Sequence, residues 1–472
     1  MLNTTSNSKH KKWILAIFLI PVAILIVIYL GMTFYYKEHF LFGSVINGVD
    51  YSGKTVSQVE ELIANASADY SIELTGRNDL KDVITASDID YKYISDGAIQ
   101  SLKDKQNSFF WIAALFKKSH ENEMTIHTSF DEDALRSCIS NMIFFEKHNI
   151  KKPKNAYVKY DKSKKEYILI PEETGSKLLS DKVFEAVKTA ISNGKTTLDL
   201  DLEGCYKTPK YTSESPKLVS FFEKIKLYSN ASITYDFSDR QEVVDINLIH
   251  DWLKVDNTNL TVSINEDSIK EYVDYLGRNY STFGTSRKFK STSGKTITVS
   301  GGDYGWLINR PAEVKALTKN IKKGKTMTKE PVYTQKGASR GTNDIGDTYV
   351  EINLTKQRLW LYKDGKKIVT SDFVSGNSSR GWQTPVGTYA ITYKERDTIL
   401  GVNSGADYRS PVSYWMPFNG NIGMHDATWR SSFGGTIYQR NGSHGCINLP
   451  LNNAKTIYEN IEARTPVIVY QE

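Results

Sequence analysis

Hydrophobic and polar residues follow three different patterns along this 472-residue chain. Residues 13–36 contain no charged side chain, and a helix of that length can cross a hydrocarbon layer of ~30 Å. From residue 44 to about 340, short apolar stretches alternate with segments of helical period. After Tyr349 the apolar residues recur with period two. These patterns predict a multidomain protein with an N-terminal transmembrane helix, an α+β middle region and a mostly-β sandwich-like C-terminal domain.

The flanking charges predict how the N-terminal helix is oriented. Lys9, Lys11 and Lys12 precede the apolar run, and basic residues favour the cytoplasmic side of a membrane. We therefore expect a cytoplasmic tail over 1–12, a transmembrane anchor over 13–36 and all later residues outside the cell membrane. A cleaved signal peptide is the alternative, but its apolar region is only ~7–15 residues long and ends in small residues. This run is longer and ends in 30–36, LGMTFYY, so a single-pass, uncleaved anchor is favoured.

The middle region contains an internal repeat. Gly175 and Gly194 are separated by the same 19 positions as Gly305 and Gly324, with a helical pattern inside each interval. Upstream, the apolar segments that begin at 72 and 233 also correspond, and Asp131 and Asn265 are matching candidates for helix N-caps, the first before a helix expected over 131–145. We predict two α+β copies over 44–209 and 210–340, and a polar, turn-rich interdomain linker over 337–343.

The last region, 345–472, is predicted to be mostly β. The expected strands are 349–354, 358–362, 367–375, 387–393 and 466–470, and only 452–461 has a helical pattern. The stretch 395–417 is rich in Gly, Ser and aromatic residues, which is compatible either with a lid over a cleft or with an ordinary long loop.

Charge and cysteine content narrow the function. Sixty basic and 54 acidic residues give a formal charge of +6, without a basic stripe carrying interleaved aromatic residues, so a nucleic-acid partner is not expected. Three cysteines do not form a disulfide framework. Cys138 and Cys205 are expected as buried free thiols, although a disulfide between them stays open. Cys446 alone has neighbours that suggest chemistry.

Those neighbours form the segment 443–448, SHGCIN, with His425 upstream. A thiol attacks acyl groups as its thiolate and therefore needs a base nearby. A glycine before the nucleophile allows a sharp turn that aims backbone N–H groups at a developing oxyanion. Spacing alone does not decide whether His425 or His444 is the base. The two histidines and Cys446 could also supply three zinc ligands, but no further metal-binding spacing accompanies them, so no metal is expected.

The segments 422–429 (IGMHDATW) and 443–450 (SHGCINLP) resemble the signature of the L,D-transpeptidases, the YkuD-type catalytic domain. The segments 384–389 and 350–361 resemble the strand entry and the opening hairpin of the same family. The resemblance covers about residues 345–471. It implies a catalytic domain over 345–472, and the paired units before it resemble the peptidoglycan-binding domains of some Gram-positive transpeptidases.

The resemblance also implies residue roles. Cys446 is the nucleophile and His425 is the base, whose imidazole is oriented by Asp426, at least partly through the Asp426 backbone carbonyl. His444 then supports the substrate or the oxyanion loop. The N–H groups of Gly445 and Cys446 are expected to form the oxyanion hole. Two further residues, Ser443 and Asn448, are expected to fix the loop by side-chain to backbone hydrogen bonds, and Arg464 and Tyr408 are weaker candidates for substrate contacts.

The implied reaction is acyl transfer without a cofactor. The donor is a peptidoglycan tetrapeptide stem, the acceptor is an amine of a second stem, and the product is a 3→3 cross-link made through a thioester. The same motif fits an L,D-carboxypeptidase or an enzyme that attaches a protein to peptidoglycan. A non-catalytic wall-binding protein, with Cys446 inert, is the alternative of another class. The two repeats either bind the cell-wall glycan or only hold the catalytic domain away from the membrane.

Overall fold

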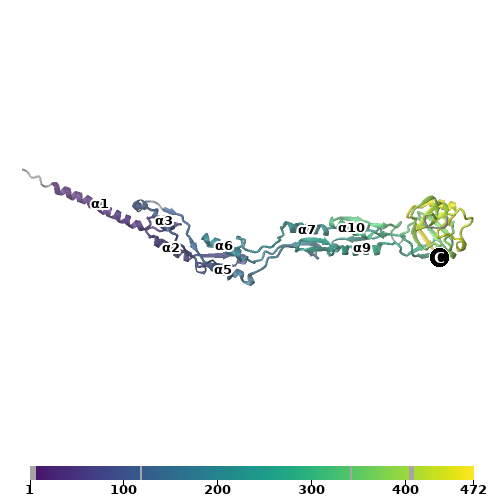
Figure 1. The fold of residues 1–472 in the computed structure, drawn as a ribbon, viewed down its shortest axis with the longest axis horizontal. Coiled ribbons are helices and arrows are strands. Elements are labelled where there is room, and N and C mark those ends of the chain that lie inside the picture. The colour runs from purple at the N-terminus through teal and green to yellow at the C-terminus, as the bar shows by residue number, and fades with distance from the viewer. Residues whose placement is uncertain (1–6, 117–119, 341–342, 403–408) are drawn as a thin grey trace, which may run out of the picture. The chain divides into compact units, whose positions relative to one another are not determined.

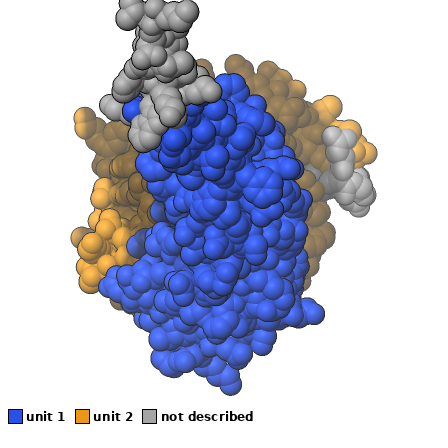
Figure 2. All heavy atoms as spheres, turned by 90° about the vertical axis from the view of Figure 1, so that its left-hand side faces the viewer, with its two compact units in different colours: residues 1–156, 171–212 blue, residues 157–170, 213–472 orange. Residues whose placement is uncertain are grey.

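A computed structural model describes residues 7–116, 120–340, 343–402 and 409–472 (Figure 1). The chain forms two compact units, which are coloured separately in Figure 2. The first contains residues 1–156 and 171–212, and the second contains residues 157–170 and 213–472. Each unit is described by itself below.

The first unit begins with the long helix α1 (Asn7–Glu38). From Ile17 to Glu38 this helix is long and apolar enough to cross a membrane, and its large apolar side chains there are mostly exposed. Pro21 lies inside it, where a membrane helix tolerates proline. The helix includes all of the predicted span 13–36.

Small elements follow α1 and surround a core that contains Phe40, Ile46 and Val59. Parallel pairing of β1 with β6 and antiparallel pairing of β1 with β2 give the sheet order β2-β1-β6. The elements are β1 (Ser44–Ile46), β2 (Val49–Asp50), α2 (Val56–Ala68), β5 (Lys92–Tyr93), α3 (Ala98–Asp104), α4 (Trp111–Leu115), β6 (His120–Asn122) and β7 (Thr128–Ser129).

The predicted repeat appears as two three-stranded sheets with the same topology. In the first copy β10 lies parallel to β3, and in the second β18 lies parallel to β11, so the orders are β10-β3-β4 and β12-β11-β18. The first copy contains β3 (Ser71–Thr75), β4 (Lys81–Thr85), α5 (Glu132–Ser140), α6 (Ser180–Ser192) and β10 (Thr197–Asp199). Their counterparts are β11 (Ser232–Asp236), β12 (Gln241–Val244), α9 (Glu266–Tyr280), α10 (Arg310–Lys322) and β18 (Thr326–Lys329).

The helix starts were predicted better than their ends and cap bonds. The Asp131 side chain caps α5 by accepting from the N–H groups of Asp133 and Ala134. This helix ends at Ser140, before the expected 145, because the chain turns there into a short 3₁₀ segment, η4 (Ile143–Phe145). Asn265 is the N-cap of α9, but its side chain donates to Ser268 Oγ and makes no cap bond to the backbone.

Each copy also contributes a β-hairpin that packs on the module after it. The hairpin β8 (Tyr157–Asp161) and β9 (Glu166–Ile170) belongs to the second unit, where Asn257 bonds both backbone groups of Val158 at 2.7 and 2.9 Å. The corresponding hairpin, β15 (Arg287–Lys290) and β16 (Thr296–Val299), packs on the C-terminal domain through Phe289 and Tyr470. The remaining elements of this region are α7 (Pro216–Ser229), α8 (Ile246–Trp252), β13 (Leu253–Asp256), β14 (Thr261–Ile264), β17 (Leu307–Ile308) and β19 (Tyr333–Gln335).

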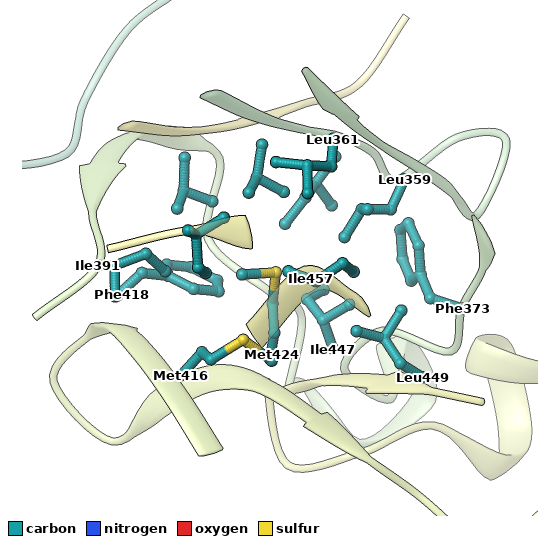
Figure 3. Close-up of a cluster of buried hydrophobic side chains, with 14 of the residues drawn as sticks. Leu359, Leu361, Phe373, Ile391, Met416, Phe418, Met424, Ile447, Leu449 and Ile457 are labelled. Carbon is teal, nitrogen blue, oxygen red and sulfur yellow. The ribbon is translucent and has the colours of Figure 1, made fainter. Parts of the chain in front are cut away.

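The C-terminal domain consists of two sheets around one apolar core (Figure 3). Their orders are β22-β21-β20-β28-β23 and β24-β25-β26-β27. The first contains β20 (Tyr349–Asn353), β21 (Arg358–Lys363), β22 (Lys366–Asp372), β23 (Gly387–Ala390) and β28 (Pro466–Tyr470). The second contains β24 (Glu395–Leu400), β25 (Ser410–Asn419), β26 (Ile422–Asp426) and β27 (Ile447–Leu449), and the helices are α11 (Ile437–Asn441) and α12 (Leu451–Asn460).

This domain contains more helix than expected, and the stretch 395–417 is not an ordinary loop. Besides the predicted helix, the short helix α11 is present, and its five residues are too few to show a helical period. The stretch 395–417, expected as a lid or an ordinary loop, contains the antiparallel pair β24–β25 on both sides of residues 403–408, which lie outside the described part.

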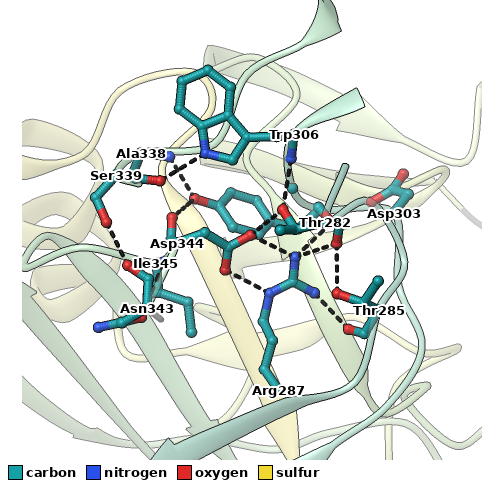
Figure 4. A network of polar contacts seen from close by, with 12 residues as sticks. Thr282, Thr285, Arg287, Asp303, Trp306, Ala338, Ser339, Asn343, Asp344 and Ile345 are labelled. Carbon is teal, nitrogen blue, oxygen red and sulfur yellow. Dashed lines mark hydrogen bonds and ion pairs between the residues drawn. The ribbon is translucent and has the colours of Figure 1, made fainter. Parts of the chain in front are cut away.

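The second repeat is bonded directly to the C-terminal domain. The Thr388 N–H donates to Gly301 O at 3.0 Å, and its carbonyl accepts from the Tyr304 N–H at 3.1 Å. Asp344 and Arg287 form a buried ion pair at 2.7 Å, and Trp306 Nε1 donates to Ser339 O (Figure 4). The described residues of the predicted linker 337–343 therefore take part in a polar network that holds this segment against the repeat.

Candidate active site

His425 and Cys446 come from neighbouring parallel strands. His425 on β26 is in register with Asn448 on β27, and Cys446 immediately precedes β27. Met424 and Ile447 point into the core (Figure 3), and side chains alternate along a strand, so His425 and Cys446 share the opposite face. There they line a cavity of about 210 Å³ with Leu400, Ser410, Trp429, Arg430, Gly442, Ser443, His444 and Asn448.

The turn before Cys446 is held by Ser443 and Thr384. Ser443 Oγ accepts from the Gly445 N–H at 3.0 Å and donates to the Cys446 carbonyl at 2.5 Å. Thr384 Oγ1 donates to the Gly445 carbonyl at 2.7 Å. Gly445 has φ of +122°, and a Cβ there would lie 3.1 Å from Ile422 Cδ1, so the turn requires glycine. The Gly445 N–H, expected as an oxyanion donor, is thus bonded to Ser443.

Asp426 acts on His425 through its backbone. The imidazole Nδ1 lies 2.8 Å from the Asp426 carbonyl oxygen. Because a carbonyl only accepts, Nδ1 carries the proton and Nε2 is the basic nitrogen. The Asp426 carboxylate accepts instead from the N–H groups of Ser413 and Tyr414 on β25, at 2.9 and 2.8 Å. It therefore orients His425 indirectly, by fixing β26 against β25.

Burial favours the neutral forms of both central groups. It raises the pKa of the Cys446 thiol to about 11, against a smaller opposite effect of the Gly423 N–H. It also lowers the pKa of the His425 imidazole, more than the Asp426 carbonyl raises it. Cys446 Sγ donates to Asn421 O at 3.6 Å, as a thiol can. At neutral pH the resting site therefore contains a thiol and an imidazole able to accept its proton.

Of the other predicted residues, His444 and Asn448 line the same cavity. His444 is exposed and stacks on Trp382, with ring centroids 4.0 Å apart. Asn448 was expected to fix the loop through its side chain, but its buried Oδ1 has no hydrogen-bond partner among the described residues. Arg464 lies in the turn before β28 and does not line this cavity, and Tyr408 lies outside the described residues.

Comparison with known proteins identifies the family. The model of the L,D-transpeptidase catalytic domain, YkuD, matches residues 347–469, and the model described as "Putative peptidoglycan binding domain" matches 83–199 and 214–328. A crystal structure of a cysteine-to-serine mutant of Enterococcus faecium L,D-transpeptidase is 34% identical over 54% of this chain and 99% of that chain, with a TM-score of 0.45. The chain belongs to the L,D-transpeptidase family.

Curated L,D-transpeptidases match over shorter regions. Probable L,D-transpeptidase 3 of Mycobacterium tuberculosis is 32% identical over 19% of this chain and 35% of its own length. A Bacillus subtilis protein described as "Putative L,D-transpeptidase YciB" is 25% identical over 26% of this chain and 64% of its own length. The chain thus matches less than two thirds of either relative. An ertapenem-acylated catalytic domain from E. faecium, solved by NMR, is 42% identical over 26% of this chain and 97% of that domain, with a TM-score of 0.24.

The cavity also contains a cation that the motif alone did not indicate. Arg430 donates through Nη1 to Asn441 O at 2.8 Å, while its buried Nε has no hydrogen-bond partner among the described residues. Leu400 and Ser410, the ends of β24 and β25 that face each other, also line the cavity. Arg430 lies in the loop that follows β26, five residues after His425.

The two remaining cysteines are free thiols. Cys138 is half-buried and Cys205 is buried, and neither forms a disulfide. Burial raises the pKa of Cys205 to about 11. Within the described ranges, no three His, Cys, Asp or Glu side chains are gathered as metal ligands.

Proposed function

We propose that this protein is a membrane-anchored L,D-transpeptidase that forms 3→3 cross-links in peptidoglycan. The observation that carries the proposal is the pairing of the Cys446 thiol and the His425 imidazole at one cavity, with Nδ1 of His425 bonded to the Asp426 carbonyl. That bond leaves Nε2 as the atom that takes the proton of the thiol. Family membership supports peptidoglycan as the substrate.

The first half of the reaction is acylation. His425 Nε2 accepts the Cys446 proton as Sγ attacks the carbonyl of the third stem residue. The bond between that carbonyl and the terminal D-amino acid breaks, and the imidazolium returns its proton to the leaving amine. The product is a thioester on Cys446. The Cys446 N–H is our candidate oxyanion donor, and the Gly445 N–H can join it only if its bond to Ser443 is released.

The second half transfers the acyl group. The amine of an acceptor stem attacks the thioester carbonyl, His425 takes a proton from that amine, and the C–S bond breaks to restore the thiol. Arg430 Nε and Asn448 Oδ1 offer a donor and an acceptor that have no partner among the described residues, which suits a substrate with carboxylate and amide groups at the cavity. The similarity to the E. faecium catalytic domain that ertapenem acylates supports carbapenems as acylating probes of Cys446.

The test is mass spectrometry of products from full-length protein and disaccharide-tetrapeptide. A dimer lacking one terminal D-amino acid, absent with Cys446→Ala, is the expected result. Release of the D-amino acid without a dimer would identify a carboxypeptidase. If neither wild type nor Cys446→Ala forms a product but a carbapenem labels wild type, the enzyme uses another acceptor, and a protein acceptor should be tested. If the carbapenem does not label wild type either, the wall-binding alternative is supported.

A matched pair of variants tests the base. We expect His425→Ala to lose ~10²–10⁴ of the acylation rate, the usual contribution of a general base. His444→Ala removes an exposed ring stacked on Trp382 and should lose far less. The reverse order would transfer the role of base to His444.

The two repeats are proposed to bind the wall. In the first unit, a cavity of about 610 Å³ is lined by stacked Tyr70 and Tyr91, with centroids 4.5 Å apart, and by Asn47 and Asn193. Flat aromatic faces beside amide groups suit a sugar polymer. We expect fragment 44–340 to be retained on purified cell wall and the Tyr91→Ala variant of the fragment to be retained less. If neither fragment binds, the repeats act only as spacers.

A further inference from the structure

Residues 107–116, called here the aromatic segment, present an unusual set of apolar side chains. The segment consists of Asn107, the 3₁₀ turn η3 (Ser108–Phe110), α4 and Phe116. Its exposed large side chains are Phe109, Phe110, Ile112, Leu115 and Phe116, of which Phe116 is 85% exposed. Soluble surfaces rarely gather so many large apolar groups in ten residues, so the segment faces something other than water.

The segment is bonded to the last part of α1. Tyr29 Oη donates to the Phe109 carbonyl at 2.9 Å, and Trp111 Nε1 donates to the Tyr29 carbonyl at 3.3 Å. The Trp111 ring lies 6.2 Å from the rings of both Tyr29 and Tyr36. The aromatic segment therefore follows α1 over two helical turns.

Lys103 fixes the neighbouring α3 to the same helix (Figure 1). Its side chain is buried, and Nζ donates to the Tyr36 carbonyl at 3.0 Å, in the last turn of α1. A cation is favoured there because the final carbonyls of a helix carry negative partial charge. Gln106 adds a bond to the chain after the helix, accepting from the Leu41 N–H at 2.9 Å. These bonds hold the aromatic segment at one height along α1.

The length of α1 sets the depth of the aromatic segment in a membrane. Tyr29 precedes Glu38 by nine residues, or ~13 Å at 1.5 Å per residue. If the charged end, Lys37 and Glu38, lies at the outer surface of a membrane, a group in contact with Tyr29 is close to the centre of a ~30 Å hydrocarbon layer. The segment's polar backbone is compatible with that depth, because Asn107 Oδ1 accepts from the Phe109 N–H and the Asn107 carbonyl accepts from the Phe110 N–H.

We propose that the aromatic segment is a second membrane element, inserted beside α1 into the outer leaflet, with lipid acyl chains as its partner. The inference rests on α1 spanning a membrane, as proposed above. A cavity of about 410 Å³ on this part of the unit is lined by Leu41, Leu102, Phe110 and Ala113 together with Lys105, Gln106, Asn107 and Asn122, a mixture that suits the boundary between acyl chains and polar headgroups. The first domain is thereby fixed to the bilayer at two points.

Photocrosslinking of the full-length chain in nanodiscs that contain radiolabelled phospholipid tests this. Benzoylphenylalanine replaces Phe110 or Phe116 in separate variants. Phe34, exposed on α1, reports whether the helix is in lipid, and Phe283, partly exposed in the second repeat, reports background. We expect lipid adducts at Phe110 and Phe116 in yields similar to Phe34 and about tenfold above Phe283, as for an element buried in the acyl region.

The controls separate the two proposals. If Phe34 labels lipid while Phe110 and Phe116 stay at the level of Phe283, the inserted segment is refuted and the anchor stands. If Phe34 also fails, α1 does not span the membrane and both proposals fall. Adducts from Phe110 or Phe116 to a second copy of the chain, in place of lipid, would also overturn the inference. Because both replaced residues are exposed, the variants should fold, which retained carbapenem labelling of Cys446 would verify.

Discussion

The rate at which a simple alkylating agent reacts with Cys446 should rise with pH, because burial raises the pKa of the thiol. With a pKa of about 11, only ~10⁻⁴ of the molecules carry the thiolate at pH 7, and ~10⁻² at pH 9. Iodoacetamide reacts with the thiolate and not with the thiol. The second-order rate should therefore rise about a hundredfold between these two pH values.

The assay is peptide-level mass spectrometry of the alkylated Cys446 between pH 6 and 10. This readout separates Cys446 from Cys138 and Cys205. The logarithm of the rate should rise by about one per pH unit throughout. His425→Ala should show the same slope, because burial lowers the pKa of His425 and so favours the neutral imidazole, which does not stabilise a resting thiolate.

Acylation by substrate should behave differently. There the proton passes to His425 as the bond forms, so acylation should be nearly independent of pH above the lowered pKa of His425 and should fall as that imidazole is protonated at acid pH. A plateau of iodoacetamide alkylation between pH 6 and 8 that disappears in His425→Ala would refute this reasoning. It would show that a thiolate–imidazolium pair already exists without substrate.

Three substitutions test other parts of the structure. Ser443→Ala leaves two backbone groups of the catalytic turn without their partner and should cost ~1–3 kcal/mol in denaturant unfolding; an unchanged midpoint would contradict the Ser443 bonds. Arg430→Met should lower kcat/KM for the tetrapeptide donor by ~10–100-fold, since it removes a charged hydrogen bond to substrate. The rate of iodoacetamide alkylation should not change. A kcat/KM equal to that of wild type would exclude the contact between Arg430 and substrate. Gly302→Ala places a Cβ 2.0 Å from Thr388 O and should abolish hydrogen-exchange protection of the Thr388 amide. Gly294→Ala is the matched control, because Gly294 has the same φ of +86° but no described atom within 4 Å of the added Cβ, and it should leave that protection unchanged.

Strand positions in the catalytic domain could be predicted because apolar residues mark them. Strand β28 has the predicted bounds, 466–470, and β20 differs from its predicted bounds by one residue. The simple alternation did not, however, predict that β20 is buried on both faces. Glu351 lies at full burial because Thr292 of the second repeat and Tyr470 both donate to its carboxylate. A sequence pattern cannot show that another module covers the polar face of a strand.

The candidate site was predicted less completely than the strands. The motif brought Cys446, His425 and Ser443 to one place, since their spacing follows the adjacent strands β26 and β27. It could not show that the Gly445 N–H, expected as an oxyanion donor, is bonded to Ser443, or that Asn448 Oδ1 has no hydrogen-bond partner among the described residues. Arg430 was missed because a single arginine in a loop has no local pattern that separates it from a surface residue.

The hairpins that each repeat places on its successor have a consequence for how such proteins can change in length. The hairpin β8–β9 fits a repeat, through Asn257, whereas β15–β16 fits the catalytic domain, through Glu351 and Tyr470. Duplicating the first repeat would therefore yield a copy whose hairpin already matches the module after it. Duplicating the second would set a hairpin shaped for the catalytic domain against a repeat. The order of the modules is thus fixed at the C-terminal end, while the number of repeats before it is free to vary.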